Sequence, residues 1–187
     1  RTLDPLAPTF VSSVDSGNLA VGLLCCAQGL RALGSQLSGL YSGLSVRLDR
    51  LAQAMDFSTL YDHEADLFYI GVDTQSGSLS PSHYDLLGSE SRLLSFVAIM
   101  LGQAPVKHWY RLGRKSVYLG RRRSGLLSYS GTMFEYMMPL LFLPVVKGTL
   151  LENACRQALW AQERLRHGGV FGVSESGYYA FDPDLFY

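Results

Sequence analysis

Apolar residues return every three or four positions along several stretches of the chain, the spacing of one face of an α-helix. The first stretch predicts a helix over about 17–34, after N-cap candidates in 12–18. Its apolar stripe consists of Leu19, Leu23, Cys26, Leu30 and Leu33. A second stretch predicts a helix over about 44–54. The clearest predicts a third over about 83–101, with Leu86, Leu87, Leu93, Leu94, Val97, Ala98 and Leu101 on one face.

The second half of the chain continues this pattern. Pro105 opens a short helix, an apolar helix runs from Met133 to Leu143 before Pro144, and Thr149 caps a longer helix ending near His167. Two small hairpins are expected, one within 66–73 before a turn at 74–77, the other pairing 116–119 with 126–129. About five helices and so few strands predict a mainly α fold, either a helical bundle or part of a helical toroid.

Length and composition narrow the class of protein. The 187 residues allow one ordinary domain or part of a larger one. Sixteen basic residues balance sixteen acidic ones, so no net charge attracts nucleic acid or an anionic membrane. Charged residues make up 17% of the chain, below the roughly 25% of typical soluble domains. This low share favours a piece whose surface is covered by a missing neighbour.

The cysteines and the apolar segments indicate the kind of cellular compartment in which the chain lies. Cys25, Cys26 and Cys155 are odd in number, and the adjacent pair indicates helix packing in a reducing compartment. Residues 1–5 lack the apolar core of a signal peptide. The longest apolar run, 137–146, is interrupted by two prolines and too short to cross a bilayer. The segment itself is therefore expected to be soluble.

Two glutamates draw attention because Ser-Glu-Ser occurs twice, at 89–91 and 174–176. Glu90 falls in line with the apolar positions of the third predicted helix, where an unpaired carboxylate is costly unless it is paired, protonated or functional. The structural alternative is a buried ion pair with Arg92 or Arg111. An enzyme that cuts or remakes a glycosidic bond needs at least two such poorly solvated carboxyl groups.

Glu175 lies in a stretch rich in glycine and aromatic residues. Small flanking residues let the backbone approach a ligand closely, and Tyr178 and Tyr179 offer flat surfaces that suit sugar rings. The alternative is an ordinary loop glutamate that caps a helix.

Further candidates are weaker. Glu135 is the only charge among a dozen apolar or small residues, which indicates either a structural ion pair or a ligand contact. Asp15 and Asp56 stand beside predicted helix ends, where capping is the default role. Tyr84 and Trp109 could stack on a pyranose or simply belong to the core.

Other classes of site find no support. The four histidines show no metal-binding spacing, so neither a zinc site nor any cofactor is expected. G-x-S-x-G, the Walker A sequence and the dinucleotide fingerprint do not occur. Residues 121–123, three arginines at a predicted hairpin tip, are too isolated to indicate nucleic-acid binding.

Six segments resemble, in chain order, motifs of one known family. Residues 10–20 resemble YVSTVDSGNLA, 55–62 MDFSFLYD, 84–93 YDLLASEARL, 108–114 HWFRLGR, 128–139 SWSGTMFEYLMP and 171–178 WGISESAY. These motifs belong to the glucoamylase-like domain of the cyclic β-1,2-glucan synthases.

The resemblance implies an (α/α)6 barrel, of which residues 1–187 would form a single partial domain. In this family the domain is thought to close linear β-1,2-glucan into a ring by transglycosylation. The implied partners are the glucan and the rest of a larger synthase, which carries the remaining barrel helices and glycosyltransferase and phosphorylase-like regions. The implied location is the cytoplasmic side of the bacterial inner membrane.

By position, the resemblance makes Glu90 and Glu175 the catalytic pair, with Glu90 as nucleophile and Glu175 as acid/base. An apolar setting for Glu90 would argue the reverse, because burial favours the protonated acid. The expected pocket residues are Asp15, Asp56, Tyr84, Trp109, Arg111, Glu135 and Tyr178. Near Glu175 the chain departs from the family, with Phe171 in place of tryptophan and Tyr-Ala-Phe at 179–181 in place of Asn-Ala-Arg.

Two alternatives stay open. An inverting endo-β-1,2-glucanase would separate its carboxyl groups by roughly 6.5–9.5 Å, whereas a retaining enzyme would hold them about 5–5.5 Å apart. The other alternative is a glucan-binding segment without turnover of its own.

Overall fold

The computed structural model describes residues 9–34, 41–119, 123–166 and 168–172. The chain divides into two compact units, unit 1 up to Arg114 and unit 2 from Lys115 onward. The structure is about 48% helical with small sheets, which confirms the mainly α prediction. In the part of the chain that the structure describes, no helix is long and apolar enough to cross a membrane.

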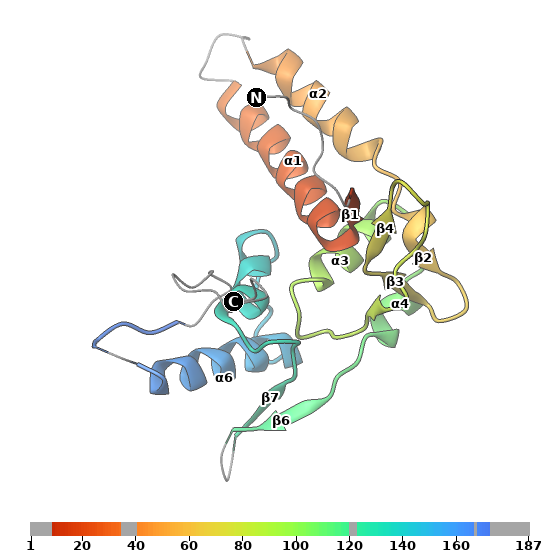
Figure 1. Ribbon diagram of the computed structural model, residues 1–187. Coiled ribbons are helices and arrows are strands. Elements are labelled where there is room, and N and C mark those ends of the chain that lie inside the picture. Colours follow the sequence, from red (N-terminus) through yellow and green to blue (C-terminus); the bar gives the residue numbers. More distant parts are fainter. Residues whose placement is uncertain (1–8, 35–40, 120–122, 167, 173–187) are drawn as a thin grey trace. The chain divides into compact units, whose positions relative to one another are not determined.

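Unit 1 is built on a pair of long helices, α1 (Ser13–Gly34) and α2 (Ser42–Gln53), which lie side by side (Figure 1). A shorter helix, α3 (Arg92–Met100), also packs against α1. The contact with α3 is close because α1 has a glycine there. A Cβ built on Gly17 would lie 2.7 Å from Leu94 Cα, so any larger side chain would force the helices apart.

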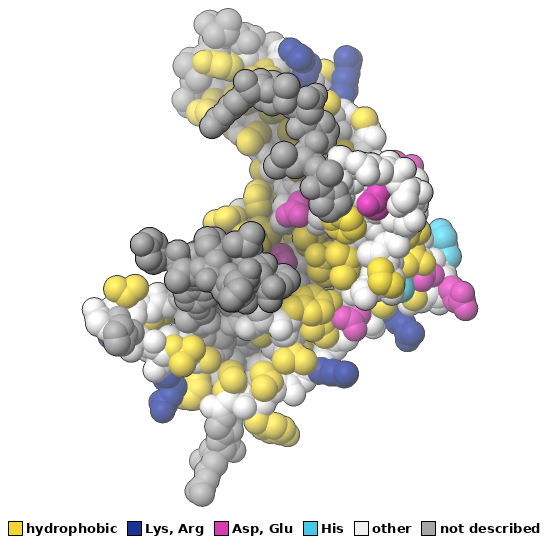
Figure 2. Space-filling model, viewed as in Figure 1, with side chains coloured by type: hydrophobic (Ala, Val, Ile, Leu, Met, Phe, Trp, Pro, Cys, Tyr) yellow, Lys and Arg dark blue, Asp and Glu magenta, His cyan; other side chains and the backbone are white. Residues whose placement is uncertain are grey.

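The apolar stripe that predicted α1 is not the face that α1 buries. The helix buries a second face of mostly small residues, Ser13, Val14, Gly17, Ala20, Val21 and Ala27. Leu19 is 58% exposed, Leu33 is 49% exposed, and Cys26 is exposed too. Hydrophobic side chains therefore reach the surface over this part of unit 1 (Figure 2).

Short strands surround the base of these helices. β1 (Phe10–Ser12) pairs antiparallel with β4 (Gly71–Asp73), with Val11 opposite Val72. A second sheet has the order β2–β3–β5, from Tyr61–Asp62, Leu67–Tyr69 and His83–Tyr84. A 3-10 turn, η1 (Ser58–Leu60), precedes β2. The predicted turn at 74–77 is confirmed, since Gly77 N–H donates to Asp73 O over 2.8 Å.

The third predicted helix is shorter than expected, beginning at Arg92 rather than 83. His83 and Tyr84 belong to β5, and the next residues bond to a distant loop instead of to a helical ladder. Gly113 N–H donates to Asp85 O over 2.6 Å, and Leu87 N–H donates to Gly113 O over 3.1 Å. These long-range bonds occupy backbone groups that a helix over 83–91 would need. α4 (Lys107–Arg111) then completes unit 1.

Unit 2 combines a hairpin with helices. β6 (Ser116–Tyr118) pairs with β7 (Ser124–Leu126), two residues earlier on the second strand than predicted. α6 (Leu150–Arg164) is capped by Thr149, as expected, whose hydroxyl accepts from Glu152 N–H.

The apolar helix predicted over 133–143 divides in two. α5 (Met133–Met137) gives way to a 3-10 segment, η2 (Met138–Leu141). The break falls at Pro139, which has no N–H to continue the α-helical ladder. Pro144 therefore does not set the end of α5.

Candidate functional site

Glu90 lies in the turn that leads into α3, so its predicted place within a helical stripe is wrong. Its side chain is partly exposed, and the Ser89 hydroxyl donates to Glu90 Oε2 over 2.8 Å. The turn is tied down by Arg92, whose Nη1 donates to Gly88 O over 3.1 Å and to Ser89 O over 2.8 Å. The carboxylate is thus presented at the edge of the core on an anchored backbone.

The two arginines proposed as partners of Glu90 both donate to backbone carbonyl groups. Arg92 is almost completely buried, 2% exposed, and holds the turn through the carbonyl bonds just described. Arg111 is exposed, and its Nε donates to Ala65 O over 3.1 Å, which joins α4 to the loop between β2 and β3.

Asp15 and Asp56 both lie near helix starts, but in the described part of the chain only the Asp56 carboxylate accepts from a backbone N–H there. Asp15 is exposed in the first turn of α1, where its N–H donates to Ser12 Oγ over 3.3 Å. Asp56 Oδ1 accepts from Ser58 N–H over 3.0 Å and so helps to start η1. Asp56 also lines an open depression of about 240 Å³ together with Ser16 and apolar residues.

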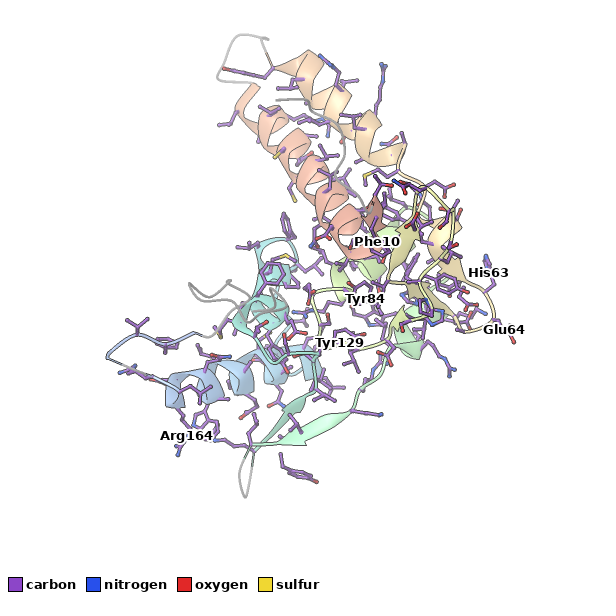
Figure 3. The ribbon with its side chains drawn as sticks, viewed as in Figure 1. Phe10, His63, Glu64, Tyr84, Tyr129 and Arg164 are labelled. Atoms are coloured by element: carbon purple, nitrogen blue, oxygen red, sulfur yellow. The ribbon has the colours of Figure 1, made fainter. Side chains whose placement is uncertain are left out.

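The two aromatic candidates are half-buried. Tyr84 lies on β5 opposite Phe68 (Figure 3). Trp109 lies on α4, and its carbonyl accepts from Arg114 Nη2 over 2.8 Å. The stacking of Tyr84 and Trp109 on a sugar ring stays a prediction.

His108, which the sequence did not single out, is completely buried in unit 1 and connects three elements. Its Nδ1–H donates to Asp66 O over 2.8 Å, so its Nε2 accepts from the Ser95 hydroxyl, also over 2.8 Å. Tyr61 and Phe68 pack edge-on against the ring. Burial lowers the pKa of His108 and keeps the imidazole neutral. The histidine of the His-Trp motif at 108–109 therefore has a structural role in unit 1.

An acidic loop lies beside this histidine. His63 and Glu64 point outward from it (Figure 3), whereas the Asp62 side chain is only 17% exposed. Backbone N–H groups of Ala65 and Glu64, bonded to Asp62, lower the pKa of that carboxyl to about 2. Asp62 Oδ2 also lies 2.9 Å from His83 Nε2. These contacts shape the turn between β2 and β3.

Glu135 in unit 2 is 1% exposed, and its carboxylate is surrounded by donors from its own loop. Oε2 accepts from the hydroxyls of Ser128 and Ser130 over 2.9 and 2.7 Å, and Oε1 accepts from Tyr129 N–H over 2.8 Å. Burial alone would raise the pKa of Glu135, but these hydrogen bonds, led by those of Ser130, lower it overall.

A capping box explains this arrangement. The Thr132 hydroxyl accepts from Glu135 N–H, while Glu135 Oε2 accepts from Thr132 N–H over 3.2 Å. The Thr-x-x-Glu spacing at 132–135 is a signal for it that was present in the sequence. Glu135 thus caps α5 and holds the preceding loop.

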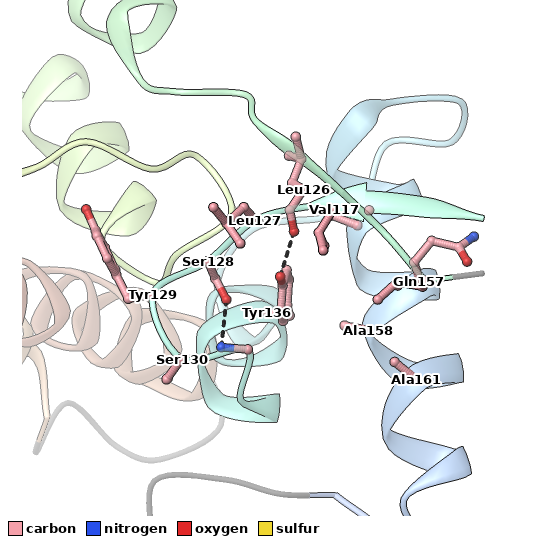
Figure 4. Close-up of a pocket in the computed structure, with 14 residues that line it drawn as sticks. Val117, Leu126, Leu127, Ser128, Tyr129, Ser130, Tyr136, Gln157, Ala158 and Ala161 are labelled. Atoms are coloured by element: carbon pink, nitrogen blue, oxygen red, sulfur yellow. Dashed lines mark hydrogen bonds between the residues drawn. The ribbon is translucent and has the colours of Figure 1, made fainter. Parts of the chain in front are cut away.

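Next to that loop lies a cavity of about 280 Å³, shown in Figure 4. It is bounded by β7, the loop 127–131 and α6. Gly131 N–H donates to Ser128 Oγ over 3.0 Å, and the Tyr136 hydroxyl donates to Leu126 O over 2.6 Å at its edge. Glu135 lies outside the lining and supports it from behind.

Glu175 and Tyr178 lie outside the described residues, so the distance between the two predicted catalytic carboxyl groups stays untested. Among the described residues, no cluster of histidine, cysteine and acidic side chains could hold a metal ion.

A comparison with known proteins found a relative that matches nearly the whole chain. The chain is 38% identical over 192 residues to the cyclic beta-(1,2)-glucan synthase NdvB of Rhizobium meliloti (strain 1021). This similarity confirms the resemblance to the cyclic β-1,2-glucan synthases. It covers 95% of this chain but only 7% of NdvB, so the chain corresponds to a small segment of such a synthase. No family model matches the chain.

Proposed function

We propose that this chain is part of a carbohydrate-active domain that acts on linear β-1,2-glucan and closes it into a ring by transglycosylation. The observation that carries the proposal is the 38% identity to NdvB, which extends over 95% of the chain and both of its units. NdvB is by name a synthase of the cyclic product, and ring closure needs a domain that remakes a glycosidic bond.

In the proposed reaction Glu90 and Glu175 form the carboxyl pair. Glu90 attacks the anomeric carbon while Glu175 protonates the departing glycosidic oxygen, which leaves a glycosyl ester on Glu90. A hydroxyl at the other end of the same glucan then attacks that carbon, Glu175 takes its proton, and the ester bond breaks. The partly exposed position of Glu90 on an anchored turn supports this role, because a nucleophile must reach its substrate from a fixed place.

We further propose that both units belong to one partial domain of an (α/α)6 barrel, completed by other parts of a longer synthase on the cytoplasmic side of the inner membrane. The unburied apolar stripe of α1 supports this, since exposed leucines at helical spacing suit a further packed helix. The glycosyltransferase region of the same protein would supply linear glucan.

The test is to change each carboxyl group in the full-length protein. Glu90→Gln and Glu175→Gln should each lower the rate of cyclic product from linear β-1,2-glucan by at least about a hundredfold, because an amide neither attacks nor transfers a proton. Glu163→Gln is the matched control, because Glu163 is 58% exposed in its ion pair with Arg166. Cyclisation at the wild-type rate in either variant would remove that glutamate from the mechanism.

Product analysis separates the alternatives. Ring product with retained anomeric configuration supports transglycosylation, whereas shortened linear product with inverted configuration supports an endo-glucanase. Saturable glucan binding without any product would assign the domain a binding role only.

A further inference from the structure

Two buried serines flank Glu90 in the turn before α3, and their hydroxyl groups have different contacts. Ser89 is 0% exposed and Ser91 is 1% exposed. The Ser89 hydroxyl donates to Glu90 Oε2 over 2.8 Å. Among the residues that the structure describes, the Ser91 hydroxyl has no hydrogen-bond partner. The Ser-Glu-Ser sequence at 89–91 therefore contains one serine that is bonded to the carboxylate and a second that is equally buried but is not.

The backbone of Ser89 is held from several sides. Its N–H donates to Leu86 O over 3.3 Å, and its carbonyl accepts from Arg92 Nη1 over 2.8 Å and from Arg92 N–H over 3.3 Å. Glu90 O accepts in turn from Leu93 N–H over 2.9 Å. A short side chain on such a fixed backbone is pre-organised, so the Ser89 hydroxyl holds the Glu90 carboxylate at little cost in entropy.

This hydrogen bond has two consequences for the chemistry of Glu90. It restricts rotation of the carboxylate at the end of a flexible side chain, and it stabilises negative charge on Oε2. A nucleophilic carboxylate must be ionised and aligned before it attacks, whereas a general acid must carry a proton. Burial, which would favour the acid, is incomplete, because the Glu90 side chain is partly exposed. The contact with Ser89 therefore favours the nucleophile.

We propose that Ser89 is the positioning residue of Glu90: its hydroxyl keeps the carboxylate ionised and oriented for attack on the anomeric carbon. The inference rests on the proposed function for the reaction itself. It gives Ser89 no contact with the substrate, because the residue is fully buried, and it gives the Ser91 hydroxyl no part in the reaction.

The experiment compares Ser89→Ala with Ser91→Ala in the full-length protein, since each removes one buried hydroxyl from the same turn. The N–H of residue 91, which donates to Ser89 Oγ over 3.3 Å, is a backbone group that alanine retains. Ser89→Ala should lower kcat for cyclic product from linear β-1,2-glucan at least about tenfold, with KM changed less than about twofold. Ser91→Ala should leave both constants within about twofold of wild type.

The pH profile separates positioning from a merely structural role. Without its donor the carboxylate is harder to ionise, so in Ser89→Ala the acid limb of kcat/KM should move to higher pH by about one unit. The charge of Arg92 is present in both variants and does not account for a difference between them. If the alkaline limb moves instead, Glu90 is the acid and the proposal is overturned.

Thermal unfolding shows whether a loss of rate comes from a loss of structure. Ser91→Ala should leave Tm unchanged or raise it, because it removes a buried hydroxyl without a described partner. Ser89→Cys retains a weaker donor and should shift the acid limb less than alanine does, so it decides the question if Ser89→Ala is too unstable to assay. A lowered rate with both limbs unmoved means that Ser89 only stabilises the turn, which overturns the proposal. A wild-type rate in Ser89→Ala, or equal losses in the two alanine variants, also overturns it.

Failure of this inference is distinguishable from failure of the proposed function. Cyclisation at the wild-type rate by Glu90→Gln would remove the reaction in which Ser89 takes part, so both proposals would be overturned. Loss of cyclisation in Glu90→Gln, together with a wild-type rate and pH profile in Ser89→Ala, would reject only the role of Ser89.

Discussion

Two buried ionisable side chains, His108 in unit 1 and Glu135 in unit 2, are stabilised in opposite charge states. His108 in unit 1 is neutral because burial lowers its pKa and its two partners are a carbonyl and a hydroxyl. Glu135 in unit 2 is ionised because backbone and hydroxyl donors surround its carboxylate. Burial therefore does not by itself say whether a group is charged; the partners decide.

The contrast also separates two structural roles. His108 joins elements that are distant in sequence, since its partners Asp66 and Ser95 are 42 and 13 residues away. The described partners of Glu135 all lie within seven residues of it. One side chain therefore stabilises tertiary packing, and the other shapes a single loop.

The two tryptophans allow each unit to be followed by itself. Trp109 belongs to unit 1 and Trp160 to unit 2, and the chain has no others. Trp160→Phe leaves a fluorescence signal from unit 1, and Trp109→Phe leaves one from unit 2. Urea unfolding of the 187-residue chain in these two backgrounds provides the measurement for the predictions that follow.

The largest effect is expected at Glu135. Glu135→Gln places an amide NH2 against several donors, so it should lower the free energy of unfolding of unit 2 by about 4 kcal/mol. Glu163→Gln should change it by less than about 0.5 kcal/mol, since Glu163 is exposed. A stable Glu135→Gln variant would mean that the carboxylate does not hold the loop.

At His108 the expected effect is somewhat smaller. His108→Leu leaves the Ser95 hydroxyl and the Asp66 carbonyl without this partner, which should destabilise unit 1 by about 3 kcal/mol while unit 2 is unaffected. His63→Leu is the control, because His63 is exposed in the neighbouring loop. An equal loss of unfolding free energy in His108→Leu and His63→Leu would show that the hydrogen bonds of the buried His108 do not stabilise unit 1.

Two glycines provide a third comparison between the units. Gly17→Ala brings a Cβ to 2.7 Å from the backbone of Leu94, which should cost unit 1 about 2 kcal/mol through overpacking. Gly125→Ala brings a Cβ to 3.1 Å from Gln157 Cβ, a looser contact that requires only a small shift, so unit 2 should lose less than about 1 kcal/mol. Similar losses in the two variants would contradict the close α1–α3 contact.

The smallest effect is the response to acid. A buried neutral histidine binds a proton more readily when unfolded, so unit 1 should have its full stability above about pH 6.5 and lose it as pH falls, by at most about 1.4 kcal/mol per pH unit. His108→Leu should remove this dependence of the stability of unit 1 on pH. The lowered pKa of Glu135 gives unit 2 stability that is lost only as pH falls below about 4.5.

The sequence predicted that helices exist better than it predicted which faces they bury. Spacing located α1, α2 and α6, but Leu19 and Leu33 of the stripe that located α1 are exposed, because Gly17 and Ala20 let neighbouring helices approach another face. Periodicity alone does not show which of two apolar faces has a partner. The exposed leucines of α1 make sense only if a further part of a larger protein packs on them.

The surroundings of the candidate site residues were harder to predict than the helices. The sequence shows the unusual setting of Glu135, and the Thr-x-x-Glu spacing of a capping box is the local signal for part of its bonding. Glu90 was placed in a helix because its neighbours fit the period, whereas long-range bonds from Gly113 to Asp85 and Leu87 exclude a helix there. No local pattern could reveal those bonds or the burial of His108.

The neighbouring Cys25 and Cys26 are exposed on α1, while Cys155 is buried. Once reductant is exhausted, dissolved oxygen oxidises accessible thiols in pairs to intermolecular disulfides. Purified chain kept in air should therefore accumulate covalent dimers and higher species joined through α1. Any measurement of its oligomeric state will need fresh reducing agent to distinguish genuine self-association from oxidation.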